Sequence, residues 1–154
     1  MASKNSGEKL IASNKKALHD YFVLQKLEAG IELTGTEVKS LRDSKANLKD
    51  SYVAIERGEA YLIGTHISPY SHGNIANHDP ERKRRLLLHK REIEKLHEQI
   101  QEKGLTVVPL RLYFKSGRVK TEIAVVRGKK LYDKRETEKR REQEREAAAA
   151  MKVR

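Results

Sequence analysis

Alternating apolar positions in the last third of the chain predict a β-hairpin. Every second residue faces the same side of a strand, and two such runs flank the turn Ser116-Gly117. The positions that would share one face are Val108, Leu110, Leu112 and Phe114 on the first strand and Val119, Thr121, Ile123 and Val125 on the second. Pro109 has no N–H to donate, so we expect it at a sheet edge or a bulge.

Shorter runs upstream predict further strands. Residues 52–63 have the pattern of a second hairpin. A strand-like run covers residues 21–27, Gly30 interrupts it, and the alternation restarts over residues 31–33. Ile67 marks another short strand.

Two segments have helical character instead. Thr36 is a candidate cap for a short helix over residues 37–42. Apolar residues recur at seven-residue spacing from Leu86 to Ile100, and Gly104 closes this longer predicted helix.

Many short strands with one inserted helix indicate a mainly β protein with helices. We expect an OB-type antiparallel barrel of about six strands with flanking helices. Residues 1–8 are expected to be a disordered N-terminus, residues 9–127 an OB-like barrel domain, and residues 128–154 a basic tail.

The balance of charge indicates a polyanionic partner. Lys and Arg total 33 against 22 Asp and Glu, a net charge of +11, which suits RNA, DNA or an anionic membrane. The alternative, basic residues serving solubility alone, is disfavoured because these residues cluster. The chain has no Cys, which excludes disulfides and Cys-based zinc sites. No signal-peptide core and no window of about 20 apolar residues occurs, so we expect a cytoplasmic protein without membrane contact.

No pattern indicates an active site. His72 and His78 share one loop, and His89 and His97 lie eight positions apart; neither pair has the spacing of two zinc ligands on a helix. Neither a Gly-x-Ser-x-Gly elbow nor a Gly-x-x-x-x-Gly-Lys loop is present. We therefore expect no catalytic residue, no metal site and no cofactor.

The strongest local feature is the basic run over residues 82–91. If residues 82–85 open the predicted helix, their four positive charges oppose its dipole. Phosphates would compensate for this, so we favour a nucleic-acid surface over a solvated helix start. A nuclear-localisation signal is the other alternative and requires a eukaryotic context. Aromatic residues make up only 5% of the chain, which favours recognition of a folded RNA by its backbone and shape over stacking on successive bases.

The tail over residues 128–154 is charged without an apolar face. It contains ten Lys or Arg and six Asp or Glu. Pairs such as Glu136 with Arg140 stabilise an isolated helix too little to hold it in water, and a coiled coil or membrane-surface helix would need an apolar side. We expect disorder in isolation and folding along a polyanion.

Several blocks of this sequence, in family order along nearly the whole chain, resemble the SmpB family, the SsrA-binding proteins of bacterial trans-translation. The blocks are Asn14-Lys15-Lys16-Ala17, His19-Asp20-Tyr21-Phe22, Glu28-Ala29-Gly30, Gly35-Thr36-Glu37-Val38-Lys39-Ser40-Leu41-Arg42, Asn47-Leu48-Lys49-Asp50-Ser51-Tyr52, Arg84-Arg85-Leu86-Leu87-Leu88-His89, Gly128-Lys129-Lys130 and Asp133-Lys134-Arg135. The chain has Asp43-Ser44 where the family commonly has Ala-Gly, and residues 144–154 follow no strict family pattern.

The resemblance implies an OB-type barrel that binds the tRNA-like domain of transfer-messenger RNA (tmRNA). It implies a non-catalytic adaptor that delivers alanyl-tmRNA, together with elongation factor Tu, to stalled 70S ribosomes. The tail would be helical in the empty mRNA channel beyond the decoding centre. A monomer is expected.

Carried over by position, the resemblance implies an RNA-binding face that contains Asn14, Tyr21, Glu28 and Leu87. The residues added for their charge and location are Lys39, Arg42, Arg84 and Arg85. The residues with an implied ribosomal role are Lys129, Lys130, Tyr132, Asp133, Lys134 and Arg135. A carboxylate on such a face can accept hydrogen bonds from base or ribose donors and so orient the RNA.

Overall fold

The computed structural model describes residues 7–70 and 77–129, and in this part of the chain it contains nine strands and three helices. The strands are β1 (Glu8–Ser13), β2 (Tyr21–Ile31), β3 (Ala46–Asn47), β4 (Tyr52–Glu56), β5 (Glu59–Ile63), β6 (His66–Ile67), β7 (Arg84–Leu87), β8 (Leu105–Lys115) and β9 (Arg118–Gly128). The helices are α1 (Lys15–Asp20), α2 (Gly35–Arg42) and α3 (Lys90–Ile100).

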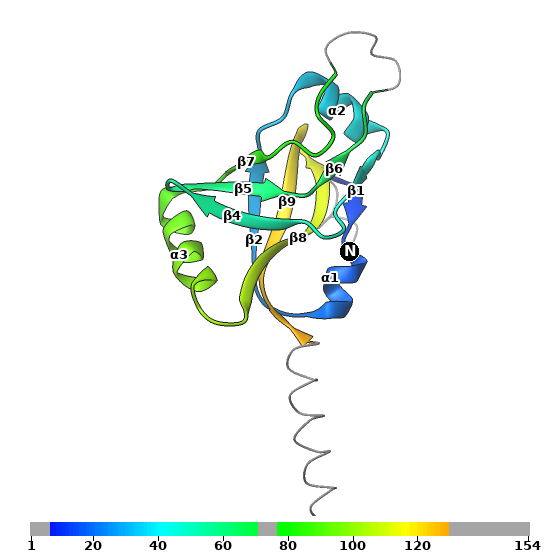
Figure 1. Ribbon diagram of the computed structural model, residues 1–154. Coiled ribbons are helices and arrows are strands. Elements are labelled where there is room, and N and C mark those ends of the chain that lie inside the picture. The colour runs from blue at the N-terminus through cyan, green and yellow to red at the C-terminus, as the bar shows by residue number, and fades with distance from the viewer. Residues whose placement is uncertain (1–6, 71–76, 130–154) are drawn as a thin grey trace, which may run out of the picture.

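The main sheet has seven antiparallel strands in the order β1-β8-β9-β2-β7-β5-β4. β4, at one end of this order, also lies against β8, so the sheet curves back on itself as a barrel. Figure 1 shows α2 above the barrel and α3 and α1 on opposite sides of it. The prediction of a mainly β, OB-type barrel is confirmed. The predicted number of strands is too low because β1 and the two-residue strand β3 carry little periodic signal, and because the residues of β7 were assigned to a helix.

The predicted hairpin at residues 108–125 is confirmed as β8 and β9, with one correction to its faces. Val119, Ile123 and Val125 are buried in the main apolar core as expected. The register shifts between Pro109 and Arg111, which confirms the bulge predicted from the proline. Because of this bulge, Val108 and Leu110 pack instead in a second apolar cluster that α1 covers, while Leu112 and Phe114 belong to the main core.

The predicted helix beginning at Leu86 is wrong. Leu86 belongs to β7 and α3 begins only at Lys90, with His89 as its N-cap. Leu86 is 1% exposed and faces the core from a strand, so its spacing from Ile93 is coincidental. The basic residues 82–85 therefore precede the helix, and the argument from the helix dipole does not apply to them.

Three smaller differences have local causes. The cap of α2 is Thr34 rather than Thr36, because the Glu37 carboxylate accepts a hydrogen bond from the Thr34 N–H at 2.8 Å. β2 runs through Gly30 to Ile31 without interruption. α1 was not predicted, and its six residues are too few to show a periodic stripe. None of the helices in the described ranges, 7–70 and 77–129, is long and apolar enough to cross a membrane.

Candidate nucleic-acid interface

One rung of the sheet crosses five strands on the outer face of the barrel. Leu10 of β1 lies opposite Tyr113 of β8, Tyr113 opposite Lys120 of β9, Lys120 opposite Gly30 of β2, and Gly30 opposite Leu87 of β7. Residues that pair directly across strands point to the same face. The pairing therefore brings two exposed leucines, a lysine and a tyrosine from distant parts of the sequence into one row.

Gly30 explains how Leu87 lies in this row. A Cβ atom added to Gly30 would lie 3.2 Å from the Cβ of Leu87 and 3.4 Å from its Cδ1. The leucine side chain thus lies across the bare backbone of β2. Leu87 remains 47% exposed, so its side chain is available to a partner.

The row opens into a surface hollow of about 750 Å³, which we call the Leu87 groove. Glu28, Arg85 and Leu87, three of the residues predicted to bind RNA, line it together. Further cations on its wall come from other elements: Arg57, Lys90 and Lys120. Arg57 and Lys120 were missed because they stand outside the basic run of the sequence, and Lys90 lies in that run but was not chosen. Only the folding of β4–β5, α3 and β9 gathers the three.

Glu28 is a fixed anion among these cations. The Tyr113 hydroxyl donates a hydrogen bond to Glu28 Oε2 at 2.5 Å, and Lys115 Nζ lies 3.2 Å from the same oxygen. The hydrogen bond from Tyr113 is the main cause that lowers the pKa of Glu28, and Lys115 and Lys120 lower it further. The carboxylate is therefore ionised at neutral pH, and one of its oxygens is already occupied.

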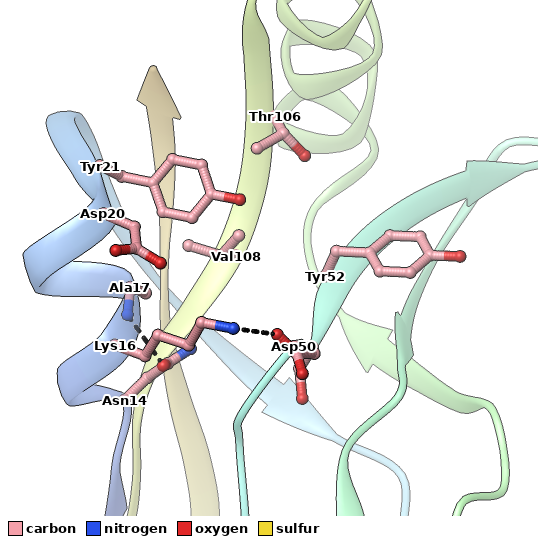
Figure 2. A pocket seen from close by; sticks show the side chains of 10 residues that line it. Asn14, Lys16, Ala17, Asp20, Tyr21, Asp50, Tyr52, Thr106 and Val108 are labelled. Carbon is pink, nitrogen blue, oxygen red and sulfur yellow. Dashed lines mark hydrogen bonds and ion pairs between the residues drawn. The ribbon is translucent and has the colours of Figure 1, made fainter. Parts of the chain in front are cut away.

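A second hollow, the Tyr21 pocket, contains two other predicted residues (Figure 2). It has a volume of about 310 Å³, and Asn14 and Tyr21 are among its lining residues. Lys16 and Asp50 form an ion pair of 2.8 Å across it. In Figure 2 the ring of Tyr21 extends over Val108 from the end of α1.

The side chain of Asn14 forms hydrogen bonds with backbone groups beside this pocket. Its side chain is 5% exposed; Oδ1 accepts from the Ala17 N–H at 3.1 Å, and Nδ2 donates to the Pro109 carbonyl at 2.9 Å and the Leu48 carbonyl at 3.3 Å. These bonds cap α1 and tie it to β8. Asn14 thereby fixes the helix that directly precedes Tyr21, and its amide has no free N–H for a partner.

Carboxylates of the protein itself neutralise most of the positive charge of residues 82–85. Arg84 is 0% exposed, and its Nε donates to Glu37 Oε2 at 2.6 Å. Arg82 donates to the other Glu37 oxygen at 2.7 Å, and Lys83 to Glu56 at 2.6 Å. Arg84 therefore does not belong to the exposed surface, although its charge and location had suggested it for the RNA-binding face. Arg85 is the member of the run that lines the Leu87 groove.

The Glu37–Arg84 pair links α2 to β7 through the interior. Arg84 also donates to the carbonyls of Thr65 at 2.8 Å and Pro80 at 3.0 Å. Burial by itself would raise the pKa of Glu37, but hydrogen bonds from Arg82, the Thr34 backbone and Arg84 outweigh it and lower the pKa to about 2. Because side chains alternate along β7, burying Arg84 directs Arg85 and Leu87 outward.

Three further predicted residues, Lys39, Arg42 and Lys129, line neither hollow. Lys39 and Arg42 are exposed on α2, and Lys39 Nζ lies 5.6 Å from the centre of the Tyr70 ring. At the end of β9, Lys129 Nζ lies 5.3 Å from the centre of the half-exposed Phe22 ring. The other tail residues with a predicted ribosomal role, Lys130, Tyr132, Asp133, Lys134 and Arg135, lie outside the described residues.

Comparisons with known proteins agree on one family. The family model described as SmpB protein matches residues 11–153. An SsrA-binding protein of Geobacter sulfurreducens is 60% identical over 146 residues, 95% of each chain. One of Sulfurihydrogenibium sp. is 57% identical over 145 residues, 94% of this chain and 95% of the relative.

A solved structure agrees with these sequence relatives. A chain described under "tmRNA-SmpB: a journey to the center of the bacterial ribosome" is 49% identical with a TM-score of 0.67, over 77% of this chain and 83% of its own. The resemblance seen in the sequence blocks is confirmed, and the protein belongs to the SmpB family.

Proposed function

We propose that this protein binds the tRNA-like domain of tmRNA and serves bacterial trans-translation as a non-catalytic RNA-binding adaptor. The Leu87 groove carries the proposal: it joins an exposed leucine and an oriented carboxylate to cations from β7, α3, β9 and the β4–β5 turn. Cations attract the phosphate backbone without selecting a site, whereas the leucine and the carboxylate supply position-specific contacts. The family and the neighbouring structure described by tmRNA, SmpB and the ribosome support this partner.

The second part of the proposal concerns delivery. The adaptor brings alanyl-tmRNA, with elongation factor Tu, to ribosomes stalled in the cytoplasm, so that the nascent peptide is tagged for degradation. Residues 129–135 act near the decoding centre, and residues 136–154 follow the empty mRNA channel as a charged helix. Lys39 and Arg42 are proposed as additional phosphate contacts because both are exposed on one helix.

Binding of the purified protein to the tmRNA tRNA-like domain tests the first part. We expect saturable binding that duplex DNA at equal concentration does not displace. Displacement by duplex DNA would favour a general DNA-binding protein instead. Incubation of the complex with magnesium should leave the RNA intact, and specific cleavage would favour an RNA-processing enzyme.

Deleting residues 131–154 tests the second part. The truncated protein should keep its affinity for the tRNA-like domain, since the groove is built from residues 28–120. Tagging on stalled ribosomes in a reconstituted translation system should be lost. Tagging at the full-length level would show that the tail is dispensable.

A further inference from the structure

The carboxylate of Glu28 is unusual on a surface that we propose to bind a polyanion. Its side chain is 39% exposed and lines the Leu87 groove with Arg85, Lys90 and Lys120. A carboxylate repels phosphates, so it weakens binding unless it accepts a hydrogen bond from a donor on the ligand. In RNA such donors are the ribose 2′-hydroxyl and the N–H groups of the bases.

The two oxygens of Glu28 have different environments. Oε2 accepts from the Tyr113 hydroxyl at 2.5 Å and from Lys115 Nζ at 3.2 Å. Among the residues that the structure describes, Oε1 has only the same lysine amine, at 3.5 Å, the long limit of a hydrogen bond. Tyr113 therefore fixes the rotation of the carboxylate and leaves Oε1 with free acceptor capacity.

Arg111 holds the Tyr113 ring on the outer face of the sheet. Tyr113 is 2% exposed on β8, and the guanidinium of Arg111 lies 4.6 Å from the centre of its ring. Arg111 is anchored in turn by Glu122 of β9 at 3.4 Å. Burial, and then the hydrogen bond to Glu28, raise the pKa of Tyr113, so its hydroxyl remains a donor throughout the physiological range.

We propose that Tyr113 is a positioning residue of the RNA interface: it orients Glu28 so that Oε1 accepts one hydrogen bond from a nucleotide in the Leu87 groove. The donor is a single O–H or N–H group of the RNA, either a ribose 2′-hydroxyl or a base N–H. This inference rests on the proposed function, because it takes an RNA as the ligand of the groove.

Affinities of four proteins for the tmRNA tRNA-like domain test the positioning role: the wild type, Tyr113→Phe, Glu28→Ala and the double variant. Losing a hydrogen bond to a charged group should lower the affinity about 30-fold for Glu28→Ala, and losing its orientation about fivefold for Tyr113→Phe. In the Glu28→Ala background, Tyr113→Phe should have no further effect. An equal fivefold loss in both backgrounds would show that Tyr113 acts through the fold alone and would overturn the proposal.

Two more measurements separate orientation from stability. Tyr113→Phe should raise the pKa of Glu28, measured by NMR, because the hydroxyl is the main cause of its lowering. Tyr61→Phe is the matched control: its hydroxyl makes no hydrogen bond within the described residues, and its ring, 4.7 Å from Lys83 Nζ, is retained. The control should bind as the wild type does.

Interference mapping identifies the donor. RNA pools with scattered 2′-deoxy nucleotides, or with base analogues lacking one exocyclic amine, are selected for binding to wild type and to Glu28→Ala. One position should interfere with the wild type and lose its effect in the variant; a 2′-deoxy position indicates the ribose, and an analogue position the base. Identical maps for both proteins would overturn the proposal. Failure of the wild type to bind the RNA would instead contradict the proposed function.

Discussion

Replacing Glu37 by Gln is the sharpest test of what holds β7 in place. The Glu37 carboxylate is 0% exposed and bonded to Arg84, also 0% exposed, at 2.6 Å, and to Arg82 at 2.7 Å. Glutamine keeps the volume and one acceptor oxygen, but it removes the negative charge. The variant therefore leaves the buried Arg84 guanidinium without a counterion, which is the costly way to break a buried pair.

Two independent arguments give similar magnitudes. Removing one partner of a buried ion pair destabilises a protein by about 3–5 kcal/mol, and the retained oxygen places Glu37→Gln at about 3 kcal/mol. The fall of the pKa of Glu37 from 4.5 to about 2 corresponds to about 3 kcal/mol of folding free energy. Because the pKa is lower in the folded protein, this stability is present above pH 4.5 and is lost as the pH falls toward 2.

Urea unfolding at a series of pH values measures both effects. At pH 7 the variant should unfold with a free energy about 3 kcal/mol below the wild type, and the difference should shrink between pH 5 and pH 2. Glu32→Gln is the control; this carboxylate, 60% exposed, lies 3.6 Å from Arg85 and should contribute less than about 1 kcal/mol. A pH-independent difference, or a variant as stable as the wild type, would refute the reasoning.

Three further changes test the interface. Gly30→Ala places a Cβ 3.2 Å from that of Leu87, so displacement of the leucine should lower RNA affinity in a binding titration. The control Gly35→Ala, with no atom within 4 Å of its Cβ, should bind RNA as the wild type does. Equal losses of affinity for the two variants would contradict the contact between Gly30 and Leu87. Lys120→Ala should lower the salt slope of log affinity by about 0.7–0.9, the value for one phosphate contact, whereas Lys103→Ala in the exposed loop before β8 should leave it unchanged. Asn14→Ala should lower the unfolding free energy by about 2 kcal/mol, because α1 loses its cap and two buried carbonyls lose a donor; an unchanged urea midpoint would contradict its structural role.

The hairpins were predictable from the sequence because alternation over many residues has one simple cause, a strand with one face buried. The long helix was misplaced for an equally physical reason. Leu86 on β7 and Ile93 on α3 both face the core, so their spacing imitates a helical repeat across the boundary between a strand and a helix. Short elements such as β3 lack enough residues for any period to appear.

The site was predictable only where the resemblance supplied it. Glu28 and Leu87 came from family blocks, and the sheet register brings both to one groove. Tyr113 and Lys120 depend on which strands are neighbours, which the alternation within one strand does not reveal. Arg84 shows the opposite error: charge indicated an exposed phosphate contact, whereas a carboxylate 47 positions earlier pairs with it in the core.

The central claim is that the Leu87 groove is the tmRNA-binding surface, and matched exposed leucines test it most directly. Leu87 is 47% exposed in the groove, and Leu24 is 51% exposed on β2 outside its lining. The dissociation constant for the tmRNA tRNA-like domain should rise at least about tenfold for Leu87→Asp, because an apolar contact becomes a buried charge near phosphates. Leu24→Asp should leave it within about twofold of the wild type. Equal effects of the two substitutions, or none from Leu87→Asp, would contradict the claim.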